Sequence, residues 1–262
     1  MTQIAGTAGI GSQEDILLIA DFGRSAQGWL SYMLCYILNA RYIEPYCLLS
    51  GTQFTESAVI AANTRGALPN RMRSRYALVV KTHNFPDRNF TLTRSVIYLT
   101  RDPRDVAVSY YYLNRNWRRA GARSPSVLLH SLPVIGHLLT ALRWRRHFQR
   151  WRHVDAHWVR YEDLRHDIEG TLISILLHFG ASEDSAVVRE AINVFSFENS
   201  YGRKRGTEDV SNSEARKGQI GDYRNHFPLW LNRLFWVICG TQAEMAGYRL
   251  DGTTTVEPIV PE

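Results

Sequence analysis

Residues 16–34 contain the feature that most limits how this chain can fold: a strand, a loop and a helix in direct succession. Ile16–Ala20 is a continuous apolar run, which predicts a buried strand. A turn-like segment from Gly23 to Gly28 follows, and an amphipathic helix is expected to open with Trp29. Such a loop can bind phosphate through backbone N–H groups and the helix N-terminus. It lacks the Gly-Lys-Ser/Thr ending of nucleotide triphosphatases, which argues against a Mg-nucleotide hydrolase.

Strands and helices alternate along the rest of the chain. Short strands are predicted at Ala77–Lys81, Val96–Thr100 and Ala156–Arg160, and helices at Pro103–Arg115 and Ile168–Phe179. This alternation predicts an α/β fold with a mostly parallel central sheet flanked by helices. Phosphate ligands are then expected at the carboxyl ends of the strands.

The chain is expected to form a single domain, since 262 residues, 45% of them apolar, can bury a full core. Residues 1–14 are expected to be disordered, and they lack the basic and apolar regions of a secretory signal. Residues 41–75 and 114–153 fit the predicted core poorly and are expected to form excursion or lid segments. The apolar run 127–142 is too short to span a bilayer.

Charge and cysteine content narrow the class of protein. The net charge of +6 favours an anionic ligand, a membrane surface or nucleic acid as a partner. Cys35, Cys47 and Cys239 are few, odd in number and widely spaced, which predicts a reducing, cytoplasmic compartment and no disulfide framework. His153 and His157 have i, i+4 spacing, but no acidic or cysteine partner is evident nearby, so no metal site is expected.

Three further polar segments accompany the first loop. Arg101 directly follows a predicted strand, and Ser109 lies eight residues later in a predicted helix. Lys81 and His83 end another strand in the segment VKTHNFP, and residues 215–227 form the Gly-rich basic segment ARKGQIGDYRNHF. In this order, the four segments resemble those of the PAPS-dependent sulfotransferases, the cytosolic type in particular. The resemblance covers most of the chain and implies their P-loop-like fold.

The resemblance implies transfer of a sulfuryl group from PAPS to a hydroxyl or amine of an acceptor, by in-line displacement and without a metal. His83 stands in the position of the general base, Lys81 stands beside the transferring group, and Arg24 takes the place of the family's loop lysine. The donor-binding residues that it implies are Arg24, Ser25, Ala26, Gln27, Gly28, Trp29, Arg101, Ser109, Tyr161, Phe197, Arg216, Lys217 and Gly218.

The implied donor contacts fall into three groups. The backbone of residues 25–28 forms the 5′-phosphate cradle, while Arg101, Ser109 and residues 216–218 bind the 3′-phosphate. Trp29 stacks on adenine, with Tyr161 and Phe197 on the same side of the donor. This sequence departs from the family's loop in three ways: Arg24 replaces lysine, Ala26 replaces glycine, and Gln27-Gly28 replace two threonines.

The acceptor is expected to be a small, partly hydrophobic molecule such as a natural product, with residues 41–75 and 114–153 on its side of the site. Residues 143–153 (RWRRHFQRWRH) could be a nucleic-acid patch, but more nearly resemble the family's Trp-x-x-His-Val-x-x-Trp helix near the acceptor pocket. No nucleic-acid partner and no stable membrane insertion are therefore expected. The family's dimer signature is not met, because Asp251 and Val260 stand where Lys and Glu belong, so the oligomeric state is open.

Two other function classes remain open from the sequence. One is an ATP-dependent phosphotransferase, which the missing Lys-Ser/Thr pair of the first loop opposes. The other is a catalytically silent nucleotide-binding protein at a basic membrane or nucleic-acid surface, which the Lys81-x-His83 pair opposes.

Overall fold

A parallel sheet lies at the centre of the protein. The computed structural model describes residues 16–43, 76, 78–86, 95–181, 184–210 and 216–255. Within them, five strands pair in the order β2-β3-β1-β4-β5, and every pairing is parallel. The strands are β1 (Ile16–Ala20), β2 (Arg41–Ile43), β3 (Leu78–Thr82), β4 (Val96–Thr100) and β5 (His157–Arg160). The predicted α/β class with a mostly parallel sheet is confirmed.

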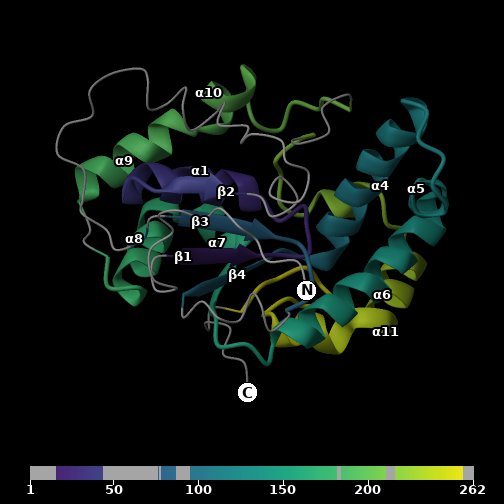
Figure 1. Cartoon of the computed structure of the whole chain (residues 1–262). Helices are drawn as coiled ribbons and strands as arrows, with labels where there is room; N and C mark the ends of the chain where they lie inside the picture. Colours follow the sequence, from purple (N-terminus) through teal and green to yellow (C-terminus); the bar gives the residue numbers. More distant parts are fainter. Residues whose placement is uncertain are drawn as a thin grey trace, which may run out of the picture.

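Helices cover both faces of this sheet (Figure 1). They are α1 (Gln27–Leu38), α4 (Pro103–Arg119), α5 (Pro125–His130), α6 (Pro133–Trp151), α7 (Tyr161–His166), α8 (Ile168–His178), α9 (Ser185–Val194), α10 (Phe197–Tyr201) and α11 (Leu229–Met245), with a 3-10 turn, η2, at Asp222–Asn225. Leu17 and Ile19 of β1 pack in one core cluster with residues of α1, α8 and α9. Leu18 and Ala20 point the other way and pack with residues of α4, α6 and α11. Side chains alternate across a strand, so both faces of β1 are buried and the fold has three layers.

The observed elements follow the sequence pattern except at one edge of the sheet and in the first helix. The strands predicted at 77–81, 96–100 and 156–160 are present, with ends shifted by at most one residue. Arg41–Ile43, assigned to a surface excursion, instead pairs with β3 as an edge strand. Helix α1 is buried over most of its length and is therefore not amphipathic, because β2, β3 and α9 all contact it.

The segment 114–153 belongs in large part to the helical layer beside α11. Its apolar run is divided at Leu132, which caps α6, and Pro133 occupies the first turn of that helix, where its missing N–H is tolerated. Trp144, Phe148 and Trp151 of α6 are buried in the second core cluster. This helix is thus a core element as well as a neighbour of the site. The expectations for residues 1–14 and 44–75 lie outside the described residues.

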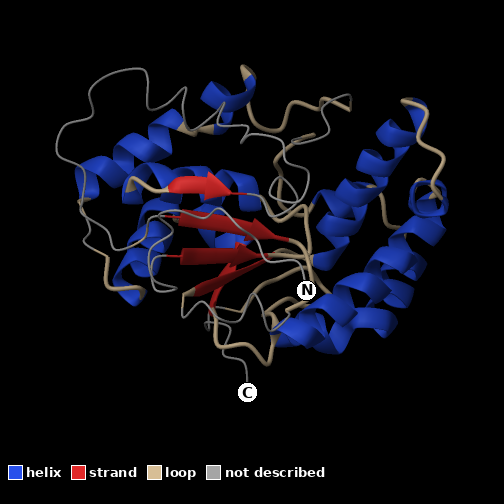
Figure 2. Ribbon diagram, viewed as in Figure 1, coloured by secondary structure: helices blue, strands red, loops and turns tan. Residues whose placement is uncertain are grey.

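The loops that carry the predicted site leave the sheet at its carboxyl edge. In Figure 2 the strand arrows point toward the loops between the sheet and α4. Strand β1 lies between β3 and β4, so the segments after these three strands begin side by side. The chain visits β2 and β3 on one side of β1 before it forms β4 on the other, and such a reversal creates a crevice at the strand ends. Within the described ranges, no helix has both the length and the apolar content needed to cross a membrane.

Candidate active site

The loop after β1 has a strained backbone and leads to an open helix end. Arg24 and Ala26 have φ values of 66° and 68°, in the left-handed region that residues other than glycine rarely adopt. Strain of this kind is concentrated at functional sites. In the described part of the chain, no side chain caps the N-terminus of α1, and its first turn contains no acidic residue. The N–H groups of this turn are therefore suited to an anion.

The side chain of Gln27 fixes this loop to the sheet. Its side chain is buried, and Nε2 donates to the carbonyl of Ile19 in β1 and to that of Thr82 in β3, the latter at 3.1 Å. The amide thus ties the loop to two strands. Because the side chain faces the sheet, only the backbone of Gln27 is left for the predicted phosphate cradle.

His83 is paired with a buried carboxylate that the sequence reasoning missed. Asp21 directly follows β1, is fully buried, and its Oδ1 lies 2.5 Å from His83 Nδ1. The register of the sheet explains this contact, because Ala20 pairs with Thr82 and the next residue of each strand then lies alongside the other. Asp21 Oδ2 also accepts a hydrogen bond from the Ser25 N–H at 3.3 Å. Asp21 therefore joins the phosphate-type loop to the histidine.

The Asp21 carboxylate sets both the charge and the tautomer of His83. Burial opposes protonation of the imidazole, but the charge of Asp21 and the hydrogen bond to it outweigh burial, so the pKa of His83 is raised. Burial alone would raise the pKa of Asp21. The charge of His83 and the hydrogen bond with it outweigh burial, so the pKa of Asp21 is lowered. An ionised carboxylate only accepts, so the neutral histidine carries its proton on Nδ1 and leaves Nε2 able to accept a proton. The His83 side chain is 42% exposed.

The first loop lies beside His83 and contacts helix α4. A Cβ placed on Gly23 would lie 3.8 Å from His83 Nδ1 and 3.7 Å from the Tyr110 ring. Arg24 Nε donates to Ser109 Oγ of α4 at 2.9 Å. Burial, followed by the charge of Arg101, lowers the pKa of Arg24 to about 10, which leaves it protonated at neutral pH. The structure thus joins the loop to the base and to two residues of the predicted 3′-phosphate site.

Arg101 holds three of the predicted segments together. Its Nη1 donates to the Arg24 carbonyl at 3.1 Å, and its Nη2 donates to the Gln219 carbonyl at 2.9 Å. The guanidinium carbon lies 4.5 Å from the centre of the Tyr161 ring. The Tyr161 hydroxyl in turn donates to the Gly218 carbonyl at 3.2 Å. Segments more than a hundred residues apart in sequence therefore converge on one arginine.

The residues predicted on the adenine side also lie near one another. The guanidinium of Arg205 lies 5.5 Å from the ring of Trp29 and 4.9 Å from that of Phe197. Trp29 Nε1 donates to the Phe195 carbonyl at 2.7 Å, which fixes the indole. Gly218 has a φ of 65°, and a Cβ there would come within 2.9 Å of the Phe197 ring, so this position requires glycine.

Arg216 and Lys217 contact acidic side chains of the chain itself. Both side chains pair with the buried Asp222, Lys217 Nζ at 3.1 Å from Oδ1, and Arg216 also pairs with Glu208. The same segment is fixed to α4 by Asp105, which accepts hydrogen bonds from two backbone N–H groups, Gly221 at 2.7 Å and Tyr223 at 2.9 Å. Their assignment to a 3′-phosphate stays a prediction.

Aromatic side chains gather near His83. The Phe22 ring lies 5.7 Å from the rings of both Tyr110 and His147, and the Phe85 ring lies 5.7 Å from that of His147. Burial lowers the pKa of His147 to about 4. It is therefore neutral near pH 7, accepting from the Tyr98 hydroxyl at 2.9 Å and donating from Nε2 to the Asn84 carbonyl at 3.2 Å.

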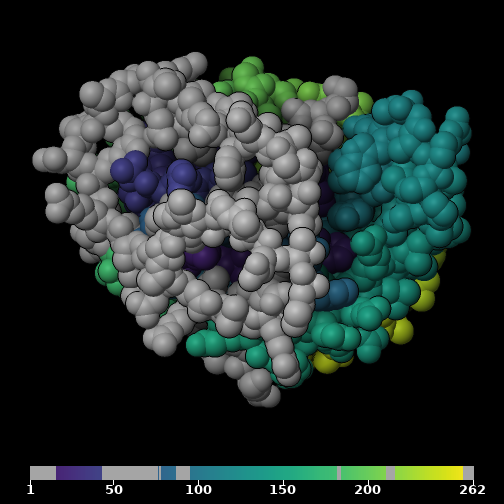
Figure 3. Space-filling view, in the orientation of Figure 1, coloured from purple at the N-terminus to yellow at the C-terminus, as the bar shows by residue number. Residues whose placement is uncertain are grey.

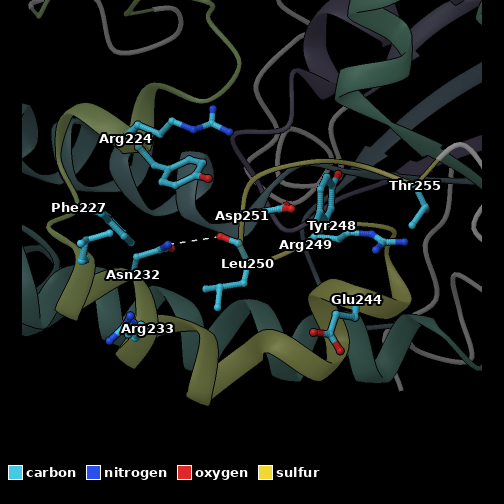
Figure 4. A pocket seen from close by; sticks show the side chains of 12 residues that line it. Arg224, Phe227, Asn232, Arg233, Glu244, Tyr248, Arg249, Leu250, Asp251 and Thr255 are labelled. Carbon is cyan, nitrogen blue, oxygen red and sulfur yellow. Dashed lines mark hydrogen bonds between the residues drawn. The ribbon is translucent and has the colours of Figure 1, made fainter.

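A separate cavity of about 880 Å³ lies beside α11 and the C-terminal segment (Figure 4). Its lining includes Phe227, Tyr248 and Thr255, and none of the predicted donor or catalytic residues belongs to it. The candidate active site is therefore the carboxyl edge of the sheet, where the charged and predicted catalytic groups converge, and not this cavity. Among the described side chains, no group of three or more His, Cys, Asp or Glu is arranged to hold a metal ion.

Comparison with known proteins identifies the family. The family model of the sulfotransferase domain matches residues 28–249, which is most of the chain. The chain belongs to the sulfotransferase family. It is 24% identical to sulfotransferase 1E1 of Bos taurus over 86% of this chain and 82% of that protein. It is 26% identical to sulfotransferase 2A1 of Rattus norvegicus over 90% of this chain and 86% of that protein. The predicted enzyme class is confirmed.

Solved structures show the same fold. Mouse sulfotransferase SULT7A1 complexed with PAP aligns with a TM-score of 0.60 at 19% identity, over 88% of this chain and 84% of that one. Retinol dehydratase in complex with androsterone and PAP aligns with a TM-score of 0.57 at 17% identity, over 88% and 81% of the two chains. At these identities the sulfotransferase is related to both proteins by fold.

Proposed function

We propose that this sulfotransferase uses PAPS as its donor and transfers the sulfuryl group in line to a hydroxyl or amine of a small acceptor, with His83 as the general base. The observation that carries the proposal is Asp21, which pairs with His83 and accepts a hydrogen bond from Ser25 of the phosphate-type loop, so the histidine is held beside that loop. A base beside an anion-binding loop is the arrangement that transfer between a bound anion and a nearby nucleophile needs.

The donor loops contain buried polar atoms suited to a ligand rich in anionic oxygens. Within the described residues, Ser25 Oγ and Arg101 Nε are both buried without a hydrogen-bond partner. Such groups are rare in folded proteins and call for a partner that is not part of the chain. Together with the open N-terminus of α1 and the charge of Arg24, they favour PAPS, the donor implied by the PAP bound in the structurally related proteins.

The chemistry then follows from the positions of the side chains. The acceptor oxygen forms a bond to sulfur while the bond between sulfur and the 5′-phosphate oxygen breaks, and PAP leaves. His83 Nε2 takes the acceptor proton as the oxygen becomes bonded. Arg24 and Lys81 stabilise the negative charge that develops on the leaving oxygen, as fixed cations do in phosphoryl transfer. A metal is not required for this proposal, because the cations come from the chain.

The aromatic side chains near His83 support a partly hydrophobic acceptor, such as a natural product. Phe22, Phe85 and Tyr110 provide apolar rings near the base. Androsterone is bound in one structurally related protein, which supports the same class of acceptor. We further propose a cytoplasmic site of action, without a nucleic-acid partner or a metal.

The decisive test is a sulfate-transfer assay with PAPS and a diverse set of hydroxyl and amine acceptors, performed on wild type and on His83→Ala. PAP affinity is expected to be nearly unchanged in the variant, because the imidazole faces Asp21 and the acceptor side. Turnover is expected to fall by about two to four orders of magnitude, the usual effect of removing a general base. Full turnover in a folded His83→Ala protein would remove the base assignment, and no transfer to any acceptor by wild type would remove the proposed function.

A further inference from the structure

We propose that the acceptor of this sulfotransferase carries a negatively charged group, which Arg146 and Arg150 of α6 bind beside the exposed ring of Phe85. The inference rests on the proposed function, because it names the acceptor class of the same site. It concerns a subsite that the donor loops and the Asp21–His83 pair do not explain.

Three arginines form one edge of α6. Arg143, Arg146 and Arg150 are spaced three and four residues apart, so they lie along the same side of the helix, and all three are exposed. The guanidinium carbons of Arg146 and Arg150 lie 5.4 and 5.8 Å from the centre of the Phe85 ring. That of Arg143 lies 5.9 Å from the centre of the Tyr110 ring. Two of the rings beside the base thus have cationic groups over them.

This edge is held close to the base. Phe85 is two residues after His83, and the carbonyl between them, that of Asn84, accepts hydrogen bonds from two residues of α6. His147 Nε2 donates to it at 3.2 Å and Trp151 Nε1 at 3.0 Å. The loop that carries the base is therefore fixed to the helix that carries the arginines. An acceptor hydroxyl at His83 brings the rest of the molecule toward Phe85.

The arginines have the donors that an anion needs. A guanidinium over an aromatic face keeps its N–H groups available at its edge, where they can bind a carboxylate or phosphate in bidentate fashion. Among the described residues, no Asp or Glu forms an ion pair with Arg143, Arg146 or Arg150. Exposed arginines beside an aromatic ring, without an acidic partner on the chain, match a ligand that has an anion next to an apolar body.

The segment that contains these arginines has one sign of charge. Residues 106–154 contain nine arginines and no Asp or Glu, whereas the rest of the chain has 22 Lys and Arg and 25 Asp and Glu. Helices α4, α5 and α6, which include most of this segment, form the teal surface at the right of Figure 3. A field of one sign beside a site raises the local concentration of oppositely charged substrate. Soluble hydroxy acids and hydroxylated acidic lipids both have the required chemistry, so the experiment has an arm for each.

The first arm compares 3-(4-hydroxyphenyl)propionate with its neutral amide. Calorimetry measures the affinity of each compound for the PAP complex, and the sulfate-transfer assay measures the KM of each as an acceptor. Wild type is expected to bind the acid at least about tenfold more tightly than the amide, the scale of a charged hydrogen-bond pair. The double variant Arg146→Gln/Arg150→Gln is expected to reduce this preference to about twofold or less. Arg145→Gln is the matched control, because Arg145 is also exposed on α6 but donates to the Ile238 carbonyl of α11.

The second arm measures binding and sulfate transfer with vesicles of phosphatidylglycerol, which has hydroxyls and an anionic phosphate, and of phosphatidylcholine, which has neither a hydroxyl nor a net charge. A preference for phosphatidylglycerol that the double variant loses and Arg145→Gln keeps identifies a lipid acceptor. The same result with the soluble acid identifies a soluble one. Absence of an anion preference in both arms overturns the inference, as does a preference that the double variant retains. Because calorimetry needs no turnover, the binding preference can be measured whether or not the proposed function holds.

Discussion

Asp21 is expected to determine the pH at which His83 acts as the proposed base. The pKa of His83 is raised, and only the neutral imidazole accepts a proton, so the wild-type rate is expected to decline as the pH falls through this raised pKa. Asp21→Asn keeps the size of the side chain but removes the charge, so the His83 pKa is expected to fall. The acid limb of kcat/KM then moves to lower pH, and the plateau of kcat decreases by about tenfold or more because the base is weaker and less well oriented.

The same substitution has a readout that does not require turnover. NMR titration of His83 in the PAP complex is expected to show a lower pKa in Asp21→Asn than in wild type. The raised pKa also contributes stability that is fully present below the usual histidine pKa and is lost as the pH rises through the raised one. Asp21→Asn should therefore lose stability mainly at acidic pH. If Asp21→Asn changes neither the acid limb of kcat/KM nor the pKa of His83, Asp21 has only a structural role.

Short motifs predicted which residues lie close together, while their roles stay predictions. Arg24, Lys81, His83, Arg101 and Ser109 were singled out by their order along the chain, and the structure brings four of them into the contacts described above. Asp21 was missed because a single carboxylate after a strand has no motif of its own. Its role depends on which strand lies next to β1, and a sequence does not state the order of strands. One sign of the pair was available in the sequence: Asp21 and His83 each directly follow a buried strand.

At the scale of elements, local pattern predicted the strands and helices that have clear periodicity or apolar runs. The three-residue strand β2 could not be predicted, because it is defined by pairing with β3 and not by its own composition. Helix α1 was expected to be amphipathic, and its burial depends on α9, a helix more than a hundred residues later. Helix α6 was placed outside the core because its basic residues are conspicuous, although its buried stripe of Trp144, Phe148 and Trp151 belongs to the core.

The predicted donor site is also assembled from several elements, because Arg101 lies between the loop after β1 and the segment before η2. Arg101→Gln is expected to weaken PAP binding by about tenfold to a hundredfold, the scale for a charged hydrogen-bond partner, and to weaken binding of AMP, which lacks the 3′-phosphate, much less. Calorimetry with the two nucleotides measures the difference. Lys204→Gln, at an exposed position outside these contacts, serves as the control. Equal losses for PAP and AMP would indicate collapse of the loops and not a lost phosphate contact.

At the scale of the whole molecule, the predicted donor site joins loops that follow β1 and β4 to a segment near residue 219, so donor binding is expected to stabilise the entire fold. PAP at about a hundred times its Kd is expected to add about 2.7 kcal/mol to the free energy of unfolding. For a chain of this size, that raises Tm by roughly 5–10 °C. The shift should persist in EDTA, because the first loop lacks the Lys-Ser/Thr pair that binds magnesium with a nucleotide. Differential scanning fluorimetry with PAP and with ATP, each with and without Mg²⁺, measures it. A larger shift with Mg-ATP than with PAP would contradict the donor assignment and favour a phosphotransferase-type site instead.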